Sequence, residues 1–200
     1  MKAGGILAVL SVLAACGQPV APDLRDTISR AQLDTVTTPL LLAEIPQRDA
    51  QATLIPWGEN GAVTTWRTAD VVSLSFVHGV VTGTRGLGDD LMSADVTGTL
   101  AALAAAASQP AGPYPRYHSY LDGQGQTVFR SYLCDMQPAV AERIEIFGQS
   151  HDVLRRQETC NTVGETAQNT YWIGEDGYIW QSRQWLGSSL GYLATETLVR

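Results

Sequence analysis

The segment from Arg85 to Leu91 carries the densest polar chemistry in the chain. Its sequence is Arg-Gly-Leu-Gly-Asp-Asp-Leu. The adjacent carboxylates of Asp89 and Asp90 could bind Ca²⁺ or act as a general acid and base. Neighbouring side chains tend to point apart, however, and a metal loop usually places its carboxylates at alternate positions. We therefore favour a structural interpretation, in which the glycines permit a turn while one Asp caps the next element and pairs with Arg85. Metal binding and glycan contact are the alternatives.

The chain has three histidines, none in an evident catalytic arrangement. His78 is expected at a tight turn and His151 in a loop at 148–152, so both should be exposed. His118 lies in an aromatic run at 114–120, where a packed or solvent-facing imidazole is commoner than a catalytic base. The site chemistry thus predicts a non-enzymatic protein with no catalytic residues, no bound metal and no cofactor.

Aromatic residues are plentiful, with five Trp and seven Tyr. In the expected strand Tyr178 to Trp185, alternation places Arg183 and Trp185 on one face and Trp180 on the other. Sugar rings stack on aromatic faces, but large aromatics more often fill a core or a protein interface. The candidate contacts to a glycan or a partner protein are Arg85, Asp89, Asp90, Trp180, Arg183 and Trp185.

The N-terminus has the pattern of an export signal. Met1 and Lys2 precede an uncharged stretch that ends in Leu-Ala-Ala before Cys16. This stretch is shorter than the roughly 20 residues of a spanning helix, so residues 1–15 are predicted to be a cleaved signal peptide.

The Cys after Leu-Ala-Ala resembles the lipobox of bacterial lipoproteins, in which the thiol receives diacylglycerol. Two or more acyl chains on one residue give stable membrane anchoring. Residues 16–22 are thus expected to form a lipidated Cys16 and a tether. Gly17 stands next to the Cys where an inner-membrane lipoprotein usually has Asp, which favours the outer membrane.

Two further cysteines, Cys134 and Cys160, make an even pair in an exported chain. Such a pair is expected to form a disulfide, stabilising the fold by about 3 kcal/mol. Two free buried thiols are the alternative. Neither has a His at zinc-ligand spacing.

Charge argues against a nucleic-acid partner. The chain has a formal net charge of −7, and removal of residues 1–15 takes away Lys2, leaving 12 Arg against 20 acidic residues, or −8 (12 − 20). No basic cluster is larger than Arg155 and Arg156, so nucleic acid is excluded as a leading partner. The remaining length suits one domain, predicted at 23–200.

The patterning predicts a mainly β domain: an antiparallel meander forming a barrel-like or curved sheet, with one or two helices. A short helix should begin after Asp23 and end by Pro39, and an Ala-rich helix should run from Asp95 to Ser108. The expected strands are Ala62–Arg67, Val71–Val77, Val80–Arg85, Thr127–Cys134, Glu142–Phe147, Val153–Cys160, Tyr171–Gly174 and Tyr178–Trp185.

Three stretches together resemble the YjbF/GfcB lipoproteins associated with exopolysaccharide and group 4 capsule production. They are Thr65-Trp66, VVTGTRGLGDDL at 80–91 and YWIGEDGYIWQSRQWLGSSLGYL at 171–193. The resemblance covers most of the mature chain and is strongest at the Gly-Leu-Gly-Asp-Asp-Leu loop and the Trp-Gln-Ser-Arg-Gln-Trp strand. It carries no catalytic residues over to this chain.

The resemblance implies a lipid-anchored accessory protein at the periplasmic face of the outer membrane. Its expected partners are the membrane, other exopolysaccharide-secretion proteins and the polysaccharide itself. Two alternatives stay open: a glycan-modifying enzyme using Asp89 and Asp90, and a lipid-binding assembly factor with an apolar groove.

Overall fold

The computed structural model describes residues 22–200. The predicted signal peptide, Cys16 and most of the tether lie outside the described residues. None of the described helices is both long and apolar enough to cross a membrane.

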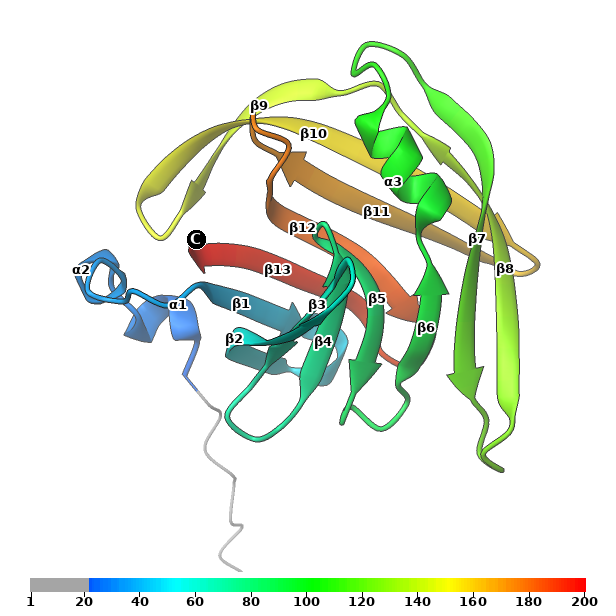
Figure 1. Ribbon diagram of the computed structural model, residues 1–200, viewed down its shortest axis with the longest axis horizontal. Helices are drawn as coiled ribbons and strands as arrows, with labels where there is room; N and C mark the ends of the chain where they lie inside the picture. Colours follow the sequence, from blue (N-terminus) through cyan, green and yellow to red (C-terminus); the bar gives the residue numbers. More distant parts are fainter. Residues whose placement is uncertain (1–21) are drawn as a thin grey trace, which may run out of the picture.

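In the described part of the chain, thirteen strands form one antiparallel sheet, curved into a nearly closed barrel (Figure 1). The strands are β1 Leu40–Ile45, β2 Ala50–Asn60, β3 Val63–Arg67, β4 Ser73–Val77, β5 Val80–Arg85, β6 Leu91–Asp95, β7 Ala111–Leu121, β8 Thr127–Met136, β9 Val140–Ile146, β10 Gln149–Thr162, β11 Glu165–Ile173, β12 Ile179–Gly187 and β13 Gly191–Val199. The predicted mainly β fold class is confirmed.

The strand order is β5-β4-β3-β2-β1-β13-β12-β11-β10-β8-β7-β6, and β9 pairs with β10 beside this path. The terminal strands β1 and β13 pair with each other, which joins the two ends of the meander. The path begins at β5 and ends at β6, so the barrel closes at a seam between two strands adjacent in sequence.

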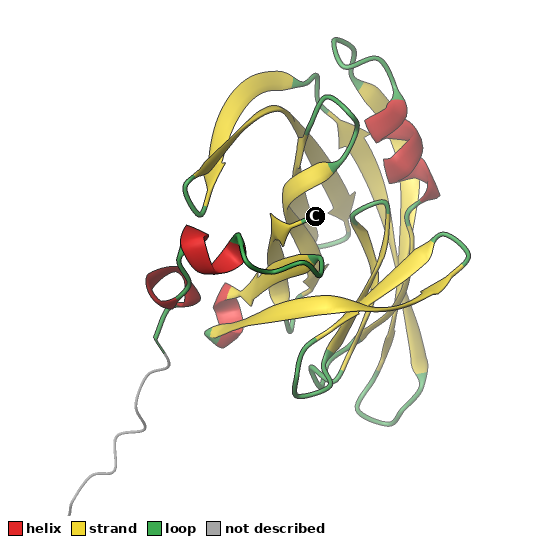
Figure 2. Ribbon diagram, turned by 60° about the vertical axis from the view of Figure 1, so that its left-hand side comes forward, coloured by secondary structure: helices red, strands yellow, loops and turns green. Residues whose placement is uncertain are grey.

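The helices are short. They are α1 Leu24–Thr27, α2 Arg30–Leu33, the 3-10 helix η1 Pro46–Arg48 and α3 Thr97–Ala104. Asp23 caps α1 as predicted, accepting a hydrogen bond from the backbone of Arg25. The single helix predicted up to Pro39 is wrong, because Ser29 leaves the helical conformation and caps α2 through a capping box with Gln32. Figure 2 shows α3 against one end of the sheet, and this helix is shorter than predicted.

Two apolar cores lie on opposite faces of the sheet. The inner core fills the barrel with Leu41, Leu54, Phe76 and Leu193 among others. On the outer face, α1, α2 and the β9–β10 hairpin cover Leu42 of β1 and other buried aliphatic residues. Because β1 alternates, Leu41 and Leu42 belong to different cores.

The predicted disulfide is confirmed. Cys134 of β8 and Cys160 of β10 are direct cross-strand partners and are bonded through their sulfur atoms. Both are buried beside Tyr132 and Ala167. The bond joins two strands that share only a short ladder, Glu158–Asn161 opposite Leu133–Met136.

A β-bulge in β12 changes which side chains share a face, compared with the alternation predicted from sequence. The β11–β12 register pairs Trp172 with Gln181 but Ile173 with Ile179, so Trp180 is the extra residue. Ile179 therefore faces inward, whereas Trp180 packs in the outer core beside Trp172. The prediction that Trp180 lies on the opposite face from Arg183 and Trp185 is wrong for this reason.

Candidate functional site

Among the described residues, a cleft of about 500 Å³ opens at one end of the barrel, where three hairpins meet the last strand. The hairpins are β2–β3, β4–β5 and β11–β12, and the last strand is β13 (Figure 1). The lining residues are Leu41, Glu59, Gly61, Ala62, Thr64, Trp66, Phe76, His78, Gly79, Asp176, Gly177, Tyr178, Ile179, Thr195, Thr197 and Arg200. A concave site of this size is the default location for ligand binding.

Aromatic side chains form part of the cleft. Phe76 is buried, while Trp66 and Tyr178 are half-buried. Trp66 packs against the inner core from β3, so the core holds this indole in place. Tyr178 is fixed by a 3.0 Å hydrogen bond between its hydroxyl and that of Thr197. The aromatic walls are therefore positioned before any ligand arrives.

Charged groups occupy the rim. The guanidinium of Arg200 pairs with the carboxylate of Asp176 and lies 4.2 Å from the centre of the Tyr178 ring. This ion pair lowers the pKa of Asp176 below its ordinary value, with a further contribution from the backbone of Tyr178. Glu59 and His78 are exposed on the opposite hairpins.

The turn that carries His78 has the geometry of a tight hairpin. His78 and Gly79 have φ values of 48° and 80°, and Val77 pairs with Val80 across them. Positive φ at both central positions is typical of a type I′ turn. The predicted turn at His78-Gly79 is thus confirmed. A Cβ atom at Gly79 would lie 3.0 Å from Ile179, so Gly permits contact between this turn and β12.

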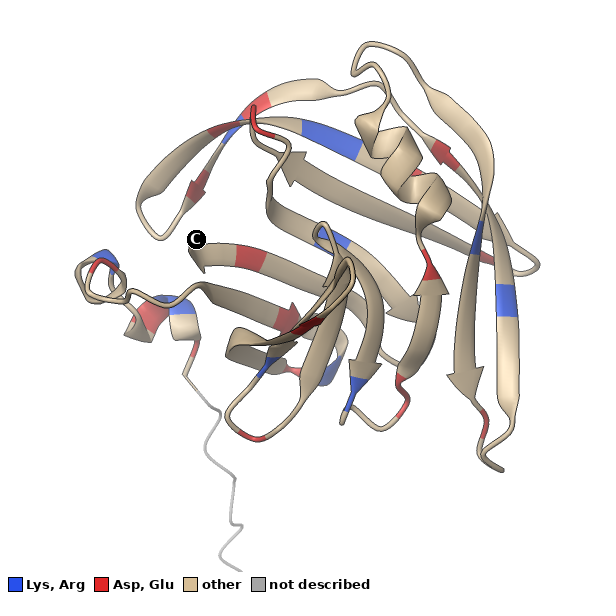
Figure 3. Ribbon diagram, viewed as in Figure 1, with Lys and Arg blue, Asp and Glu red and all other residues tan. Residues whose placement is uncertain are grey.

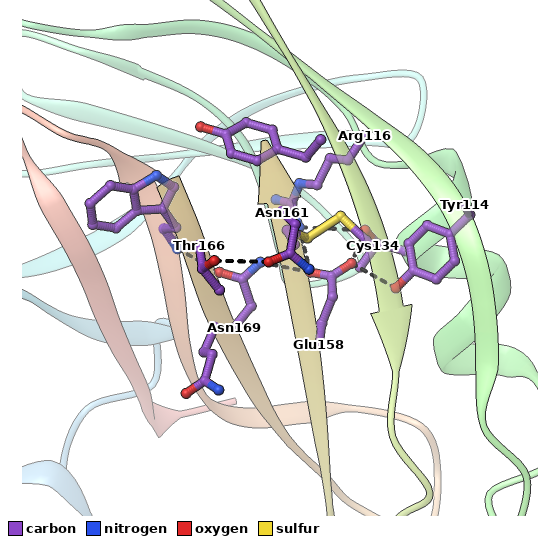
Figure 4. Close-up of a disulfide and its surroundings, with 12 residues drawn as sticks. Tyr114, Arg116, Cys134, Glu158, Asn161, Thr166 and Asn169 are labelled. Carbon is purple, nitrogen blue, oxygen red and sulfur yellow. Dashed lines mark hydrogen bonds and ion pairs between the residues drawn. A yellow bond between two sulfur atoms is a disulfide. The ribbon is translucent and has the colours of Figure 1, made fainter. Parts of the chain in front are cut away.

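A second polar cluster is sealed inside the protein, near the disulfide (Figure 4). The carboxylate of Glu158 is fully buried and accepts five hydrogen bonds. The donors are Thr99 at 2.6 Å, Tyr114 at 2.7 Å, Arg116 at 2.8 Å, Asn169 at 2.6 Å and Tyr171 at 3.2 Å. Burial by itself would raise the pKa of Glu158, but the charge of Arg116 and these hydrogen bonds lower it below its ordinary value.

A directed hydrogen-bond chain continues from this cluster. Arg116 Nε donates to His118 Nε2 at 3.1 Å, so His118 carries its proton on Nδ1 and donates to the Tyr120 oxygen at 2.8 Å. The Tyr120 hydroxyl in turn donates to the carbonyl of Leu186 at 2.9 Å. Burial and the charge of Arg116 lower the pKa of His118 to about 3. His118 is therefore neutral and packed at ordinary pH.

The groups of this inner cluster have shifted pKa values, as catalytic groups often do, but a substrate cannot reach them. Arg116, Glu158 and Tyr171 are 2% exposed or less. None of them lines the cleft at the end of the barrel. We interpret the cluster as a structural network joining α3, β7, β10 and β11. A grouping of Cys134, Glu158 and Cys160 has metal-like spacing, but its sulfur atoms are consumed by the disulfide.

The Arg85–Leu91 loop closes the barrel seam. Arg85 donates to the carbonyls of Leu91 and Met92 at 3.2 and 3.1 Å, which links β5 to β6. Asp90 accepts hydrogen bonds from the backbone of Gly86 and from the Thr84 hydroxyl. The loop thus has the structural organisation favoured by the sequence.

The expected pairing of Arg85 with Asp89 or Asp90 is wrong. Asp89 instead pairs with Arg48 of η1 at 3.0 Å, and both side chains are exposed. Asp90 bonds to backbone that precedes it, so it does not cap the next element. The two carboxylates serve different neighbours and form no joint site.

The aromatic candidates of β12 lie on the outer face in two groups. Arg183 lies 3.3 Å from the centre of the Tyr192 ring, and Trp185 packs edge-on against the same ring. Trp180 stacks on His151 with ring centres 3.9 Å apart. His151 is half-buried in β10, so the exposed loop predicted for it is wrong. The two-residue turn Phe147-Gly148, with φ of 47° and 79°, starts β10 at Gln149.

The chain also contains a hydrolase-type sequence motif, which the interpretation of the site residues from sequence did not include. Residues 187–191 read Gly-Ser-Ser-Leu-Gly and match the Gly-x-Ser-x-Gly pattern of hydrolases. That pattern requires a strand, a sharp turn and a helix, whereas here it connects β12 to β13 in a hairpin. Among the described residues, no histidine forms a hydrogen bond with Ser188 or Ser189, so the motif lacks its catalytic partners.

None of the six predicted contact residues lines the cleft. Sequence reasoning missed the cleft because it is assembled from hairpins distant in the chain. Two signals pointed toward it: Trp66 stands in a motif of the resemblance, and Tyr178 begins the predicted strand Tyr178–Trp185.

Comparison with known proteins shows one family match and one solved structure of similar fold. The family model described as group 4 capsule polysaccharide lipoprotein GfcB, YjbF matches residues 16–198. No curated protein matches the chain. Among solved structures, the crystal structure of the hypothetical lipoprotein YmcC from Escherichia coli (K12) is similar, with a TM-score of 0.72. The alignment has 17% identity and covers 88% of this chain and 91% of that one, so this likeness shows the fold alone.

Proposed function

The chain belongs to the YjbF family of group 4 capsule polysaccharide lipoproteins, and we propose that it is a non-enzymatic accessory factor in producing or secreting an extracellular polysaccharide. The observation that carries this proposal is the extent of the family match, residues 16–198. The match begins at the Cys predicted to carry lipid and includes all but the last residue of the final strand.

The proposed location is the periplasmic face of the outer membrane. Acyl chains on Cys16 would hold the domain there, and Gly17 supports sorting away from the inner membrane. Charged side chains are distributed over the strands rather than gathered in a basic patch (Figure 3), which is consistent with anchoring by lipid rather than by anionic headgroups.

The hydrogen bonding of the Asp pair argues against a glycan-modifying enzyme. Both oxygens of Asp90 already accept hydrogen bonds from the loop itself, and Asp89 is paired with Arg48 at the surface. A general acid and base need to reach one substrate between them. These contacts favour a supporting role for Asp89 and Asp90 in the loop, and so they favour a binding role for the domain over a catalytic one.

Genetic complementation tests the accessory role. In a strain lacking the gene, wild-type protein should restore surface polysaccharide, and Cys16→Ser should not, because the domain would no longer be held at the outer membrane. A Cys134→Ala/Cys160→Ala variant is the matched control, since it keeps Cys16 and should still incorporate labelled palmitate. Full polymer output from unacylated Cys16→Ser protein would refute the anchoring role.

The same assay separates binding from catalysis. Asp89→Asn should restore polymer fully, as should Arg48→Gln, because each removes only an exposed ion pair of small energetic value. Loss of polymer with folded Asp89→Asn, while Arg48→Gln remains active, would support the enzyme hypothesis instead.

A further inference from the structure

We infer that the cleft between the β2–β3, β4–β5 and β11–β12 hairpins binds a short, uncharged segment of a glycan chain. This inference rests on the proposed function, because it names the ligand class through which an accessory polysaccharide protein would act.

The cleft presents a fixed aromatic surface. Trp66 and Tyr178 are half-buried on different hairpins, and both line the 500 Å³ cleft. Their positions are fixed by the inner core and by the Thr197 hydroxyl respectively. Pyranose rings present CH faces that pack on flat aromatic rings, so two fixed rings in one cleft suit a sugar better than a peptide of arbitrary sequence.

The cleft also has unused hydrogen-bonding capacity. Within residues 22–200, the indole N–H of Trp66, the hydroxyl of Thr64 and the imidazole of His78 make no hydrogen bond within the protein, and none of them is a buried unsatisfied group, although each residue lines the cleft. Together they offer donors and acceptors to the alternating hydroxyls of a sugar. An acyl chain would leave these groups unpaired, which argues against a lipid occupant.

The charges around the cleft favour an uncharged ligand. Among the described residues, the one Arg that lines the cleft is Arg200, which pairs with Asp176, and Glu59 adds a further negative charge at the rim. An acidic sugar would meet no unpaired Arg here and would approach a domain with a formal charge of −8 after loss of residues 1–15. A neutral or N-acetylated segment is therefore the fitting ligand.

The test is a binding measurement on the full-length lipoprotein in detergent. The probes are short fragments of the polysaccharide made by the producing cells, separated by anion exchange into uncharged and acidic fractions. Palmitate and a mixed tripeptide serve as the other ligand classes. We expect the uncharged fraction to bind and to shift the tryptophan fluorescence.

Two variants locate the binding. Trp66→Leu should weaken binding at least roughly tenfold, because it keeps apolar packing but removes the flat ring. Its matched control is Trp57→Leu on the same hairpin, since Trp57 is 64% exposed, stacks on Arg67 and lies outside the cleft. Should Trp66→Leu fail to fold, Thr64→Arg fills the cleft from a half-buried position, and Thr65→Arg on the other face of β3 is its control.

Every outcome decides the inference. Binding of the uncharged fraction that is lost in Trp66→Leu or Thr64→Arg, and kept in the two controls, supports it. Binding of only the acidic fraction, palmitate or the tripeptide overturns it, as does binding unaffected by either cleft variant or no binding at all.

If Trp66→Leu loses binding yet Cys16→Ser protein restores polymer normally, the proposed anchoring fails while the glycan site stands. If the cleft binds nothing but Cys16 is essential, the glycan site fails alone.

Discussion

At the scale of single residues, Arg116 and Glu158 bring a full ion pair into the barrel wall, with side chains 1% and 0% exposed. Removing two charges from water is costly, and only good geometry with further hydrogen bonds offsets that cost. Thr99, Tyr114, Asn169 and Tyr171 supply those bonds to the carboxylate. The pair therefore specifies how α3 and three strands come together, more than it adds net stability.

Glu158→Gln should lower the free energy of unfolding by about 3–5 kcal/mol, because it leaves the Arg116 charge buried without a counter-ion. Adding Arg116→Met to that variant should recover part of the loss. Urea unfolding of the two single variants and the double variant measures this coupling. Strictly additive losses would show that the two charges are not stabilising each other.

His118 makes stability sensitive to mild acid. Its folded pKa of about 3 lies below the ordinary value of 6.5, so the unfolded chain binds the extra proton first as pH falls. The contribution of neutral His118 to the free energy of unfolding should thus be complete above pH 6.5. Below that pH it should fall by up to about 1.4 kcal/mol per pH unit. Urea unfolding between pH 7 and pH 5 should give a smaller slope for His118→Gln, which keeps a donor and an acceptor but cannot titrate. Equal slopes in the two proteins would contradict this assignment.

At the scale of elements, Gln184 braces the barrel from inside. Its carbonyl accepts from the Val81 N–H at 2.9 Å, and its amide donates to the Gly79 carbonyl at 2.8 Å. These two bonds tie β12 to the β4–β5 turn, which forms one wall of the cleft. The brace makes the shape of the proposed glycan site depend on the barrel interior.

Gln184→Leu should lower the free energy of unfolding by about 1–3 kcal/mol, since the buried Val81 N–H loses its partner. Hydrogen exchange of the Val81 amide should become faster, because the β4–β5 turn is no longer held against β12. Gln181→Leu is the control on the opposite face of the same strand, where the amide donates to Glu196. If the Val81 amide exchanges at the same rate in both variants, Gln184 is not the brace.

Local patterning predicted elements well wherever strands alternate between turns. β5 was predicted with its observed limits, and the two-residue turn at His78-Gly79 was identified by its Gly. The strands β1, β2, β6, β7 and β13 were not predicted. In β1 and β13, runs of consecutive buried residues at 41–43 and 195–198 remove simple alternation. The extra residue in β12 could not be foreseen either, since a bulge depends on the pairing with β11.

At the scale of the whole molecule, the fold class, the disulfide and the family resemblance could be predicted from sequence alone, whereas the cleft required the structure. Trp66 and Arg200 are 134 residues apart in the chain and share a cleft only because β1 pairs with β13. Asp89 and Asp90 were chosen as contact candidates for their local composition. In the structure, Asp90 bonds to the backbone of the loop at the barrel seam, and Asp89 forms an ion pair with Arg48 at the surface. Sites built from distant hairpins leave no compact motif for sequence reasoning to find.

The lipid anchor is the central claim, because it places the acidic barrel beside a membrane that its charge would not otherwise favour. Intact-mass spectrometry of the native protein tests this claim most directly. We predict a mature chain that begins at Cys16 and is heavier than its polypeptide by a diacylglyceryl group and a further acyl chain. A native chain that begins at Met1 and carries no acyl group would contradict the account.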